Sequence, residues 1–108
     1  MISKARAVVI GGGVVGVSTL YHLASKGWEN VVLLERKSLT SGSTWHAAGL
    51  LPLFNMSYSV GQIHKYSVRF YQELQNETGM DVGFRKVSNI RLASQKDRMD
   101  EYMQYKGV

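Results

Sequence analysis

The hexad Gly11-Gly12-Gly13-Val14-Val15-Gly16 constrains the fold of this chain more than any other feature of its sequence. It satisfies the pattern G-x-G-x-x-G and follows Lys4–Ile10, a short β-branched run that predicts a buried strand. It opens Val14–Lys26, where apolar residues recur at helical spacing, and Val31–Glu35 then predicts a second buried strand. Strand, helix and strand make a parallel βαβ unit with a right-handed crossover. The predicted fold class is therefore α/β.

Each glycine of the pattern has a separate physical role in a dinucleotide-binding turn. Gly11 permits the tight turn, Gly13 lets the backbone approach a pyrophosphate, and Gly16 lets the helix pack closely on the strand. The helix begins at Val14 and Val15, so its unpaired N–H groups and its positive end face the phosphates. In this context the hexad predicts a dinucleotide site rather than a glycine turn without function.

The second predicted strand ends on a carboxylate, Glu35. It lies at about the 20-residue offset expected for an acid that accepts hydrogen bonds from a ribose diol. The same charge repels a 2′-phosphate, which disfavours NADP. We count Arg36, the next residue, with the cofactor-binding residues. The βαβ unit alone does not separate FAD from NAD.

Composition excludes several other classes of protein. The 108 residues include no cysteine, which rules out disulfides and thiolate chemistry, and no residue set suggests a metal site. No apolar run approaches the roughly 18 residues of a membrane helix, so membrane insertion is not expected. The net charge of +5 is spread from Lys4 to Lys106 without a cluster, so nucleic acid is not an expected partner. The length allows at most one small domain, and the last predicted helix has no closing signal before Val108. We therefore expect residues 1–108 to be the amino-terminal part of one incomplete Rossmann-type domain.

Beyond the βαβ unit the sequence predicts further elements. Val60–Asn76 has the pattern of an amphipathic helix, with Gly79 after its end. Phe84–Val87 and Asn89–Ala93 are short extended segments that are expected to pair across a turn. Ser94–Asp97 resembles a capping box that opens a last helix.

The loop between these regions carries a family resemblance. The stretch Gly42-Ser43-Thr44-Trp45-His46-Ala47-Ala48-Gly49-Leu50, together with Val8–Glu35, resembles the amino terminus of the dimethylglycine and sarcosine dehydrogenase family. These are flavoproteins of the D-amino-acid-oxidase type, with an FAD-binding Rossmann-type domain. The resemblance continues through Ile63-His64, Glu77-Thr78-Gly79, Val82-Gly83-Phe84 and Ile90-Arg91-Leu92-Ala93, and so covers essentially the whole chain.

The resemblance implies roles for particular residues. The histidine that matches His46 is joined covalently to the 8α-methyl carbon of FAD in that family. A neutral imidazole nitrogen is a suitable nucleophile near pH 7. Ser43 and Thr44 would lie beside the phosphates and ring, and Ala47–Leu50 (Ala47, Ala48, Gly49 and Leu50) would run under the isoalloxazine. The other two histidines, His22 and His64, stand on predicted helices and are interpreted as structural.

The activity implied by the resemblance is oxidative N-demethylation of a small methylated glycine, dimethylglycine or sarcosine. The implied electron acceptor is an electron-transfer flavoprotein or oxygen, and tetrahydrofolate is a possible second cofactor of a longer protein. The substrate-facing and folate-binding parts of the family have no counterpart in these residues, so we assign no catalytic residue. We expect the 108-residue chain alone to be inactive and poorly folded, because parallel strands need cover on both faces.

Two alternatives compete with the amine-oxidising enzyme. One is a truncated or regulatory relative that keeps the dinucleotide-binding unit without turnover. The other is an NAD-binding reductase module, which gives no reason for the His46 stretch. Met1 stands three residues before the first predicted strand, so we expect no transit peptide in a protein that starts there. A cytoplasmic location follows for a bacterial protein that starts there, and the mitochondrial matrix for a eukaryotic one.

Overall fold

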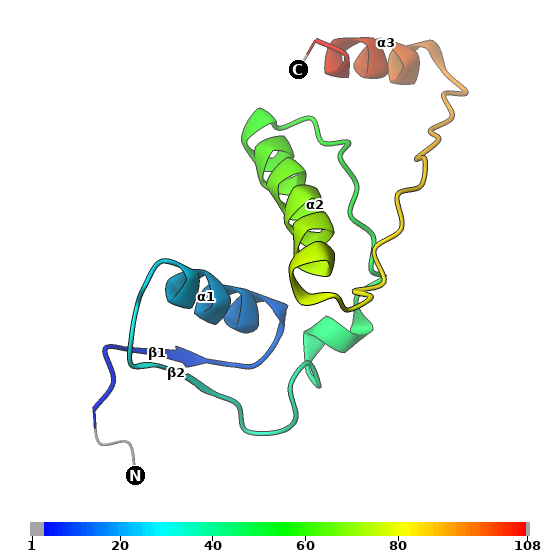
Figure 1. Cartoon of the computed structure of the whole chain (residues 1–108). Coiled ribbons are helices and arrows are strands. Elements are labelled where there is room, and N and C mark those ends of the chain that lie inside the picture. The colour runs from blue at the N-terminus through cyan, green and yellow to red at the C-terminus, as the bar shows by residue number, and fades with distance from the viewer. Residues whose placement is uncertain (1–3, 108) are drawn as a thin grey trace. The chain divides into compact units, whose positions relative to one another are not determined.

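The computed structural model describes residues 4–107 and confirms the α/β class. Strand β1 (Ala7–Ile10) leads into helix α1 (Val14–Ser25), which returns the chain to strand β2 (Val31–Leu34) (Figure 1). The two strands pair in parallel, with Ala7 beside Val31 and Ile10 beside Leu34. The predicted strands are longer than the observed ones, but hydrogen bonds between the strands continue past both ends. The N–H of Arg6 donates to the carbonyl of Asn30, and that of Gly11 to the carbonyl of Leu34.

Helix α1 covers one face of this small sheet. Ala7 and Val9 are half-buried, whereas Val8 is 51% exposed and Ile10 85% exposed. The prediction of fully buried strands is therefore wrong for the described residues, because no second layer covers the other face. No hydrophobic side chain among the described residues is fully buried.

Contacts between Cα atoms divide the chain into two compact units, one up to Gly49 and one from Leu50 on. The second unit contains the helices α2 (Tyr58–Thr78) and α3 (Lys96–Tyr105). Helix α2 starts after Ser57, whose hydroxyl accepts the N–H of Val60 at 3.5 Å, and ends at Gly79 in the left-handed conformation. The helix predicted over Val60–Asn76 is thus correct in place and extends by two residues at each end.

Two predictions for the second unit are wrong. Phe84–Val87 and Asn89–Ala93 form no strands, and Ile90 and Leu92 are more than 80% exposed. An isolated pair of strands is only marginally stable in water, and no third strand among the described residues supports it. The capping box at Ser94 is also absent, because α3 begins after Gln95, which makes no side-chain capping bond.

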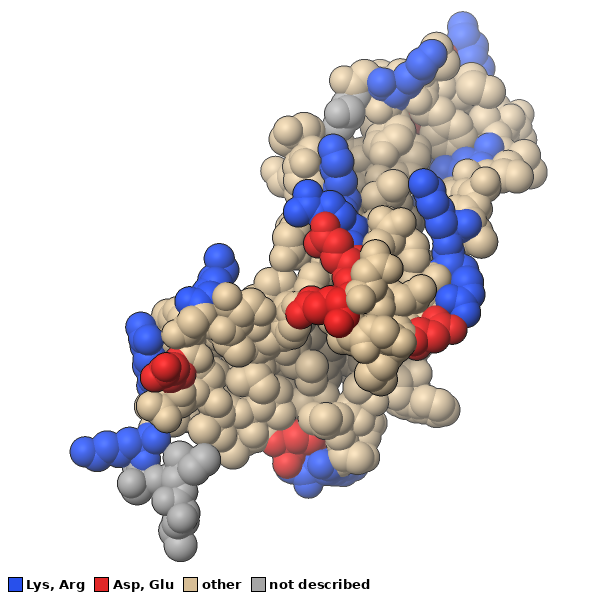
Figure 2. Space-filling model, viewed as in Figure 1, with Lys and Arg blue, Asp and Glu red and all other residues tan. Residues whose placement is uncertain are grey.

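The charged side chains and the polarity of the helices bear on two expectations from the sequence, those for nucleic acid and for membrane insertion. On the face seen in Figure 2, carboxylate side chains lie among the lysine and arginine side chains, so the basic residues form no continuous patch there. Within the described residues, every helix is too short or too polar to cross a bilayer.

Candidate functional site

The turn between β1 and α1 (the glycine turn) requires glycine at two positions, Gly11 and Gly16. Gly11 has φ of +104°, a conformation that residues with a Cβ rarely adopt. A Cβ added to Gly16 would lie 1.9 Å from the carbonyl oxygen of Gly11. Helix α1 therefore packs directly on the backbone of the turn, as the spacing of the pattern predicts.

Gly12 is a residue that the pattern treats as variable, yet it is buried in the structure. A Cβ there would lie 2.6 Å from Cδ2 of Leu39 and 3.1 Å from Cβ of Glu35. The carbonyl of Gly12 accepts the N–H of Thr40 at 2.9 Å, so the loop after β2 folds over the turn. Sequence reasoning missed this role, and the available signal was that Gly12 extends the pattern to three consecutive glycines.

Glu35 follows β2, and its carboxylate accepts backbone hydrogen bonds from the glycine turn and from the loop after β2. Its Oε2 accepts the N–H of Gly12 at 2.7 Å, and its Oε1 accepts the N–H of Lys37 at 2.8 Å. The hydrogen bond from Gly12, followed by that from Lys37, lowers the pKa of Glu35 below its ordinary value. Each carboxylate oxygen has a further lone pair, so ribose hydroxyls can still donate to Glu35.

The depressed pKa of Glu35 predicts a pH dependence for this turn. Its hydrogen bonds stabilise the folded chain fully above the ordinary carboxyl pKa of 4.5, and this contribution is lost as the pH falls through the lower folded pKa. In the complete polypeptide that carries this chain, we expect Glu35→Gln to flatten the acid limb of a plot of thermal midpoint against pH. Glu29→Gln, at an exposed carboxyl that lies outside the glycine turn, is the matched control. An unchanged acid limb in Glu35→Gln would contradict the assignment.

Thr44 caps the first turn of α1 from a distant part of the sequence. It lies in the short 3₁₀ helix η1 (Ser43–His46), and its Oγ1 accepts the N–H of Val14 at 2.9 Å. The same oxygen is 2.9 Å from the position that a Cβ on Gly13 would take. Thr44 thus satisfies a donor at the helix end where an anion would bind, so a phosphate oxygen would replace or join its hydroxyl.

The glycine turn, Glu35 and Thr44 line one cavity of about 650 Å³. Most of the residues predicted to bind the cofactor line it, namely Gly11, Gly13, Val14, Val15, Gly16, Glu35, Arg36, Ser43, Thr44 and Ala47. Among the residues that sequence reasoning did not select, Thr19, Lys37 and Ser41 also line this cavity. Four predicted residues do not, namely His46, Ala48, Gly49 and Leu50.

His46 ends η1 with its side chain exposed. Its Nδ1 lies 3.0 Å from the carbonyl oxygen of Gly42, and its ring meets that of Trp45 edge-on. Because a carbonyl oxygen can only accept, this contact in a neutral imidazole places the proton on Nδ1 and the lone pair on Nε2. His22 instead contacts its own helix, with Nδ1 2.7 Å from the carbonyl oxygen of Ser18, as expected for a structural residue.

These features together fit a dinucleotide. The glycine turn has no side chains that would keep a phosphate away from its backbone, and the N-terminus of α1 supplies N–H donors and the positive end of the helix dipole. The carboxylate of Glu35 supplies acceptors for the hydroxyls of a ribose. No cluster of three potential metal ligands occurs among the described residues.

Comparison with known proteins agrees with this geometry. A model of the DAO family, described as FAD dependent oxidoreductase, matches residues 6–107. Mitochondrial dimethylglycine dehydrogenase of Rattus norvegicus is 50% identical over 99 residues, and mitochondrial sarcosine dehydrogenase of Homo sapiens is 46% identical over 101 residues. These matches cover 92% and 93% of this chain but only 12% and 11% of the two relatives. The crystal structure of glycine oxidase from Bacillus cereus aligns with a TM-score of 0.69 at 27% identity, over 96% of this chain and 30% of the other.

Proposed function

The chain belongs to the DAO family of FAD-dependent oxidoreductases, and on that premise we propose that it forms the FAD-binding amino-terminal part of an amine-oxidising enzyme. The proposed substrate is a small N-methylated amino acid, dimethylglycine or sarcosine, as the names of the relatives suggest. The observation that carries the proposal is the cavity formed by the glycine turn, Glu35 and Thr44. The rival interpretation as an NAD-binding module is less favoured, because the family uses FAD.

The chain's own residues would hold FAD in defined places. The glycine turn and the α1 terminus would bind the pyrophosphate, with the hydroxyl of Thr44 beside it. Glu35 would bind the ribose of the adenosine half. When bound, FAD supplies the redox chemistry by accepting a hydride from the N-methyl carbon, so the chain's part is to bind and orient the ring.

We further propose that Nε2 of His46 is covalently joined to the 8α-methyl carbon of FAD. The support is the stretch from Gly42 to Leu50 and the hydrogen bond that leaves Nε2 with its lone pair. His46 would form a C–N bond in place of a C–H bond of the methyl group, with the proton released to solvent and two electrons passed to FAD, which the electron acceptor of the enzyme would then reoxidise. The small residues after His46 would let the backbone run close under the ring.

The overall reaction converts an N-methyl group and water into formaldehyde and the demethylated amine, while two electrons and two protons pass to an acceptor. We propose an electron-transfer flavoprotein or oxygen as that acceptor, and tetrahydrofolate as a recipient of the one-carbon unit. Both dehydrogenase relatives are named as mitochondrial, so we propose the mitochondrial matrix in a eukaryote and the cytoplasm in a bacterium.

A single preparation tests the proposal. We expect the complete polypeptide that carries this chain to purify yellow and to lose its colour when dimethylglycine or sarcosine is added without oxygen. When oxygen or an electron-transfer flavoprotein is then added as the acceptor, formaldehyde should form in proportion to the acceptor consumed, and less should be released when tetrahydrofolate is present. Bound flavin that no methylated amine bleaches would favour the non-catalytic alternative instead.

A further inference from the structure

Thr44 and His46 lie two positions apart on the short helix η1, in the unit that ends at Gly49. The N–H of Ala47 donates to the carbonyl of Thr44 at 3.2 Å, which closes the turn that contains His46. A hydrogen bond between residues three apart belongs to a 3₁₀ helix, which is wound more tightly than an α-helix. The backbone of His46 is therefore joined to that of Thr44 within one tight turn, and the position of η1 determines where the histidine lies.

Hydrogen bonds connect η1 to the glycine turn along two routes. On the first route, the carbonyl of Gly12 accepts the N–H of Thr40 at 2.9 Å, and the carbonyl of Thr40 accepts the N–H of Trp45 at 3.2 Å. On the second, Oγ1 of Thr44 accepts the N–H of Val14 at 2.9 Å. The first route uses backbone groups alone, whereas the second depends on a side chain. Thr44 is thus the residue whose side chain holds η1 on the N-terminus of α1.

The loop that leads into η1 has a strained backbone at Thr40. Its φ is +65°, in the left-handed region that β-branched residues rarely adopt. Such a conformation persists only where the surrounding contacts impose it. Because the N–H and the carbonyl of Thr40 both form hydrogen bonds of the first route, the loop keeps this shape through its attachment to the glycine turn. Loss of the second route would leave this strained loop as the hydrogen-bonded connection and would let η1 shift.

The imidazole of His46 is oriented by the same short segment. Its Nδ1 lies 3.0 Å from the carbonyl oxygen of Gly42, the residue before η1, and its ring meets that of Trp45 edge-on with 5.7 Å between the centroids. The side chain is exposed and does not line the cavity at the glycine turn. Among the described residues, the ring therefore takes its orientation from residues 42–45, so the position of Nε2 follows that of η1.

We propose that Thr44 is a positioning residue for the covalent attachment of FAD, because its hydrogen bond to Val14 holds η1, and with it Nε2 of His46, in place. The inference rests on the proposed function and on the proposed bond to His46. Thr44 takes no part in the chemistry of that bond, whose proton leaves to solvent and whose two electrons pass to FAD and then to the acceptor. A hydroxyl that accepts one hydrogen bond can still donate another, so Thr44 can hold Val14 and a phosphate oxygen together.

The test measures the rate of attachment in the complete polypeptide that carries this chain, produced without riboflavin and then mixed with FAD in air. Flavin that stays with the acid precipitate is quantified over time, at FAD concentrations that saturate the rate. We expect Thr44→Val, which keeps the shape but lacks the acceptor, to attach FAD about 10- to 100-fold more slowly, because a small misplacement of a reacting group costs that much. Thr44→Ser, which keeps the hydroxyl, should restore a rate close to that of the wild type. Saturating FAD separates this effect from any loss of FAD affinity.

A second comparison keeps the test independent of how well Thr44→Val folds. Thr44→Cys differs from Thr44→Ser by one atom, and its sulfur accepts hydrogen bonds only weakly. We therefore expect Thr44→Cys to attach FAD more slowly than Thr44→Ser. Both variants should bind FAD noncovalently when they are combined with His46→Ala, which shows that the glycine turn is still formed.

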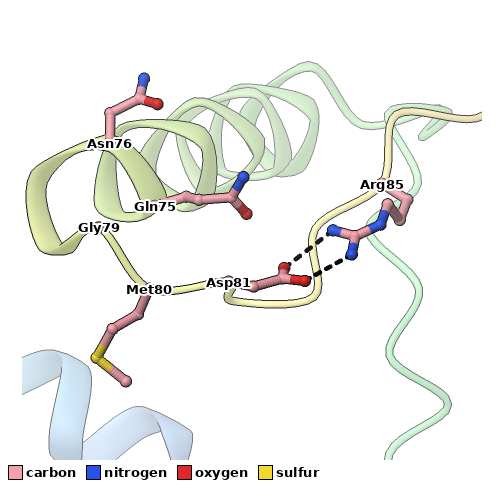
Figure 3. A pocket seen from close by; sticks show the side chains of 6 residues that line it. All are labelled: Gln75, Asn76, Gly79, Met80, Asp81 and Arg85. Carbon is pink, nitrogen blue, oxygen red and sulfur yellow. Dashed lines mark hydrogen bonds and ion pairs between the residues drawn. The ribbon is translucent and has the colours of Figure 1, made fainter.

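Thr78→Val is the matched control, because it removes another hydroxyl that accepts a backbone N–H. Oγ1 of Thr78 accepts the N–H of Met80 at 3.3 Å, at the end of α2. Figure 3 shows the segment that follows, in which Arg85 donates to both carboxylate oxygens of Asp81 and so lowers the pKa of Asp81 to about 2. This ion pair is intact at neutral pH, so the segment keeps a contact that does not depend on Thr78. The control should attach FAD at the wild-type rate.

The outcomes separate this inference from the proposed function. Attachment at the wild-type rate in Thr44→Val, equal rates in Thr44→Ser and Thr44→Cys, or a Thr44→Ser as slow as Thr44→Val would overturn the role of Thr44 and leave the bond to His46 intact. A wild type that releases all of its flavin in acid would contradict that bond, and the inference with it. A slow Thr44→Val that Thr44→Ser restores would support the inference even in an enzyme that oxidises no methylated amine, a result that would count against the proposed function alone.

Discussion

Replacing His46 with alanine is expected to release all of the FAD from the polypeptide on acid precipitation, whereas the wild-type precipitate stays yellow and fluorescent. The expected change is from complete to zero covalent retention, because the variant lacks the nitrogen that forms the bond. Before precipitation the variant should still bind FAD, since the glycine turn, the α1 terminus and Glu35 are unchanged and His46 does not line their cavity.

A second histidine provides the control for this experiment. His22 lies on α1 in the same unit, and its Nδ1 contacts the carbonyl of Ser18. His22→Gln should therefore keep the flavin through precipitation. Flavin that stays with His46→Ala, or that leaves the wild type entirely, would contradict the proposed linkage while leaving FAD binding itself untouched.

The sequence predicts the first unit well, because its determinants are local. The strand, the glycine hexad and the helix follow one another within 20 residues, and each has a pattern that depends on near neighbours. Gly16 is an example, since its contact with the carbonyl of Gly11 spans only five positions. Glu35 was also expected at the site, because the length of a βαβ unit fixes where the second strand ends.

Contacts between distant residues account for most of what the sequence did not predict. The hydroxyl of Thr44 caps Val14 across 30 residues, and Gly12 is buried by Leu39 from the loop after β2. No local pattern encodes either contact. The strand pair predicted between Phe84 and Ala93 does not form for a related reason. Two extended segments need a further strand or helix packed against them, and the local sequence pattern does not show whether one is present.

Gly16→Ala is expected to have the largest effect of any single-methyl change in this site. The new Cβ would lie 1.9 Å from the carbonyl oxygen of Gly11 and 3.0 Å from its carbonyl carbon, so backbone rather than a flexible side chain would have to move. Overpacking of this kind costs about 3 kcal/mol. If the turn opens, FAD affinity should fall by roughly 100-fold. Measuring the affinity in a His46→Ala background prevents covalent attachment from masking the loss.

Gly61→Ala separates the clash from the general effect of replacing a helical glycine. Gly61 lies in α2, and a Cβ there would meet nothing within 4 Å. Alanine in a helix is favoured over glycine by about 0.5–1 kcal/mol, so this variant should be slightly more stable than the wild type, with unchanged FAD affinity. The two identical substitutions are thus expected to move the thermal midpoint in opposite directions. If Gly16→Ala behaved like Gly61→Ala, then α1 would not depend on direct contact with the turn, and the anion-binding end of the helix would not be fixed by the glycine spacing.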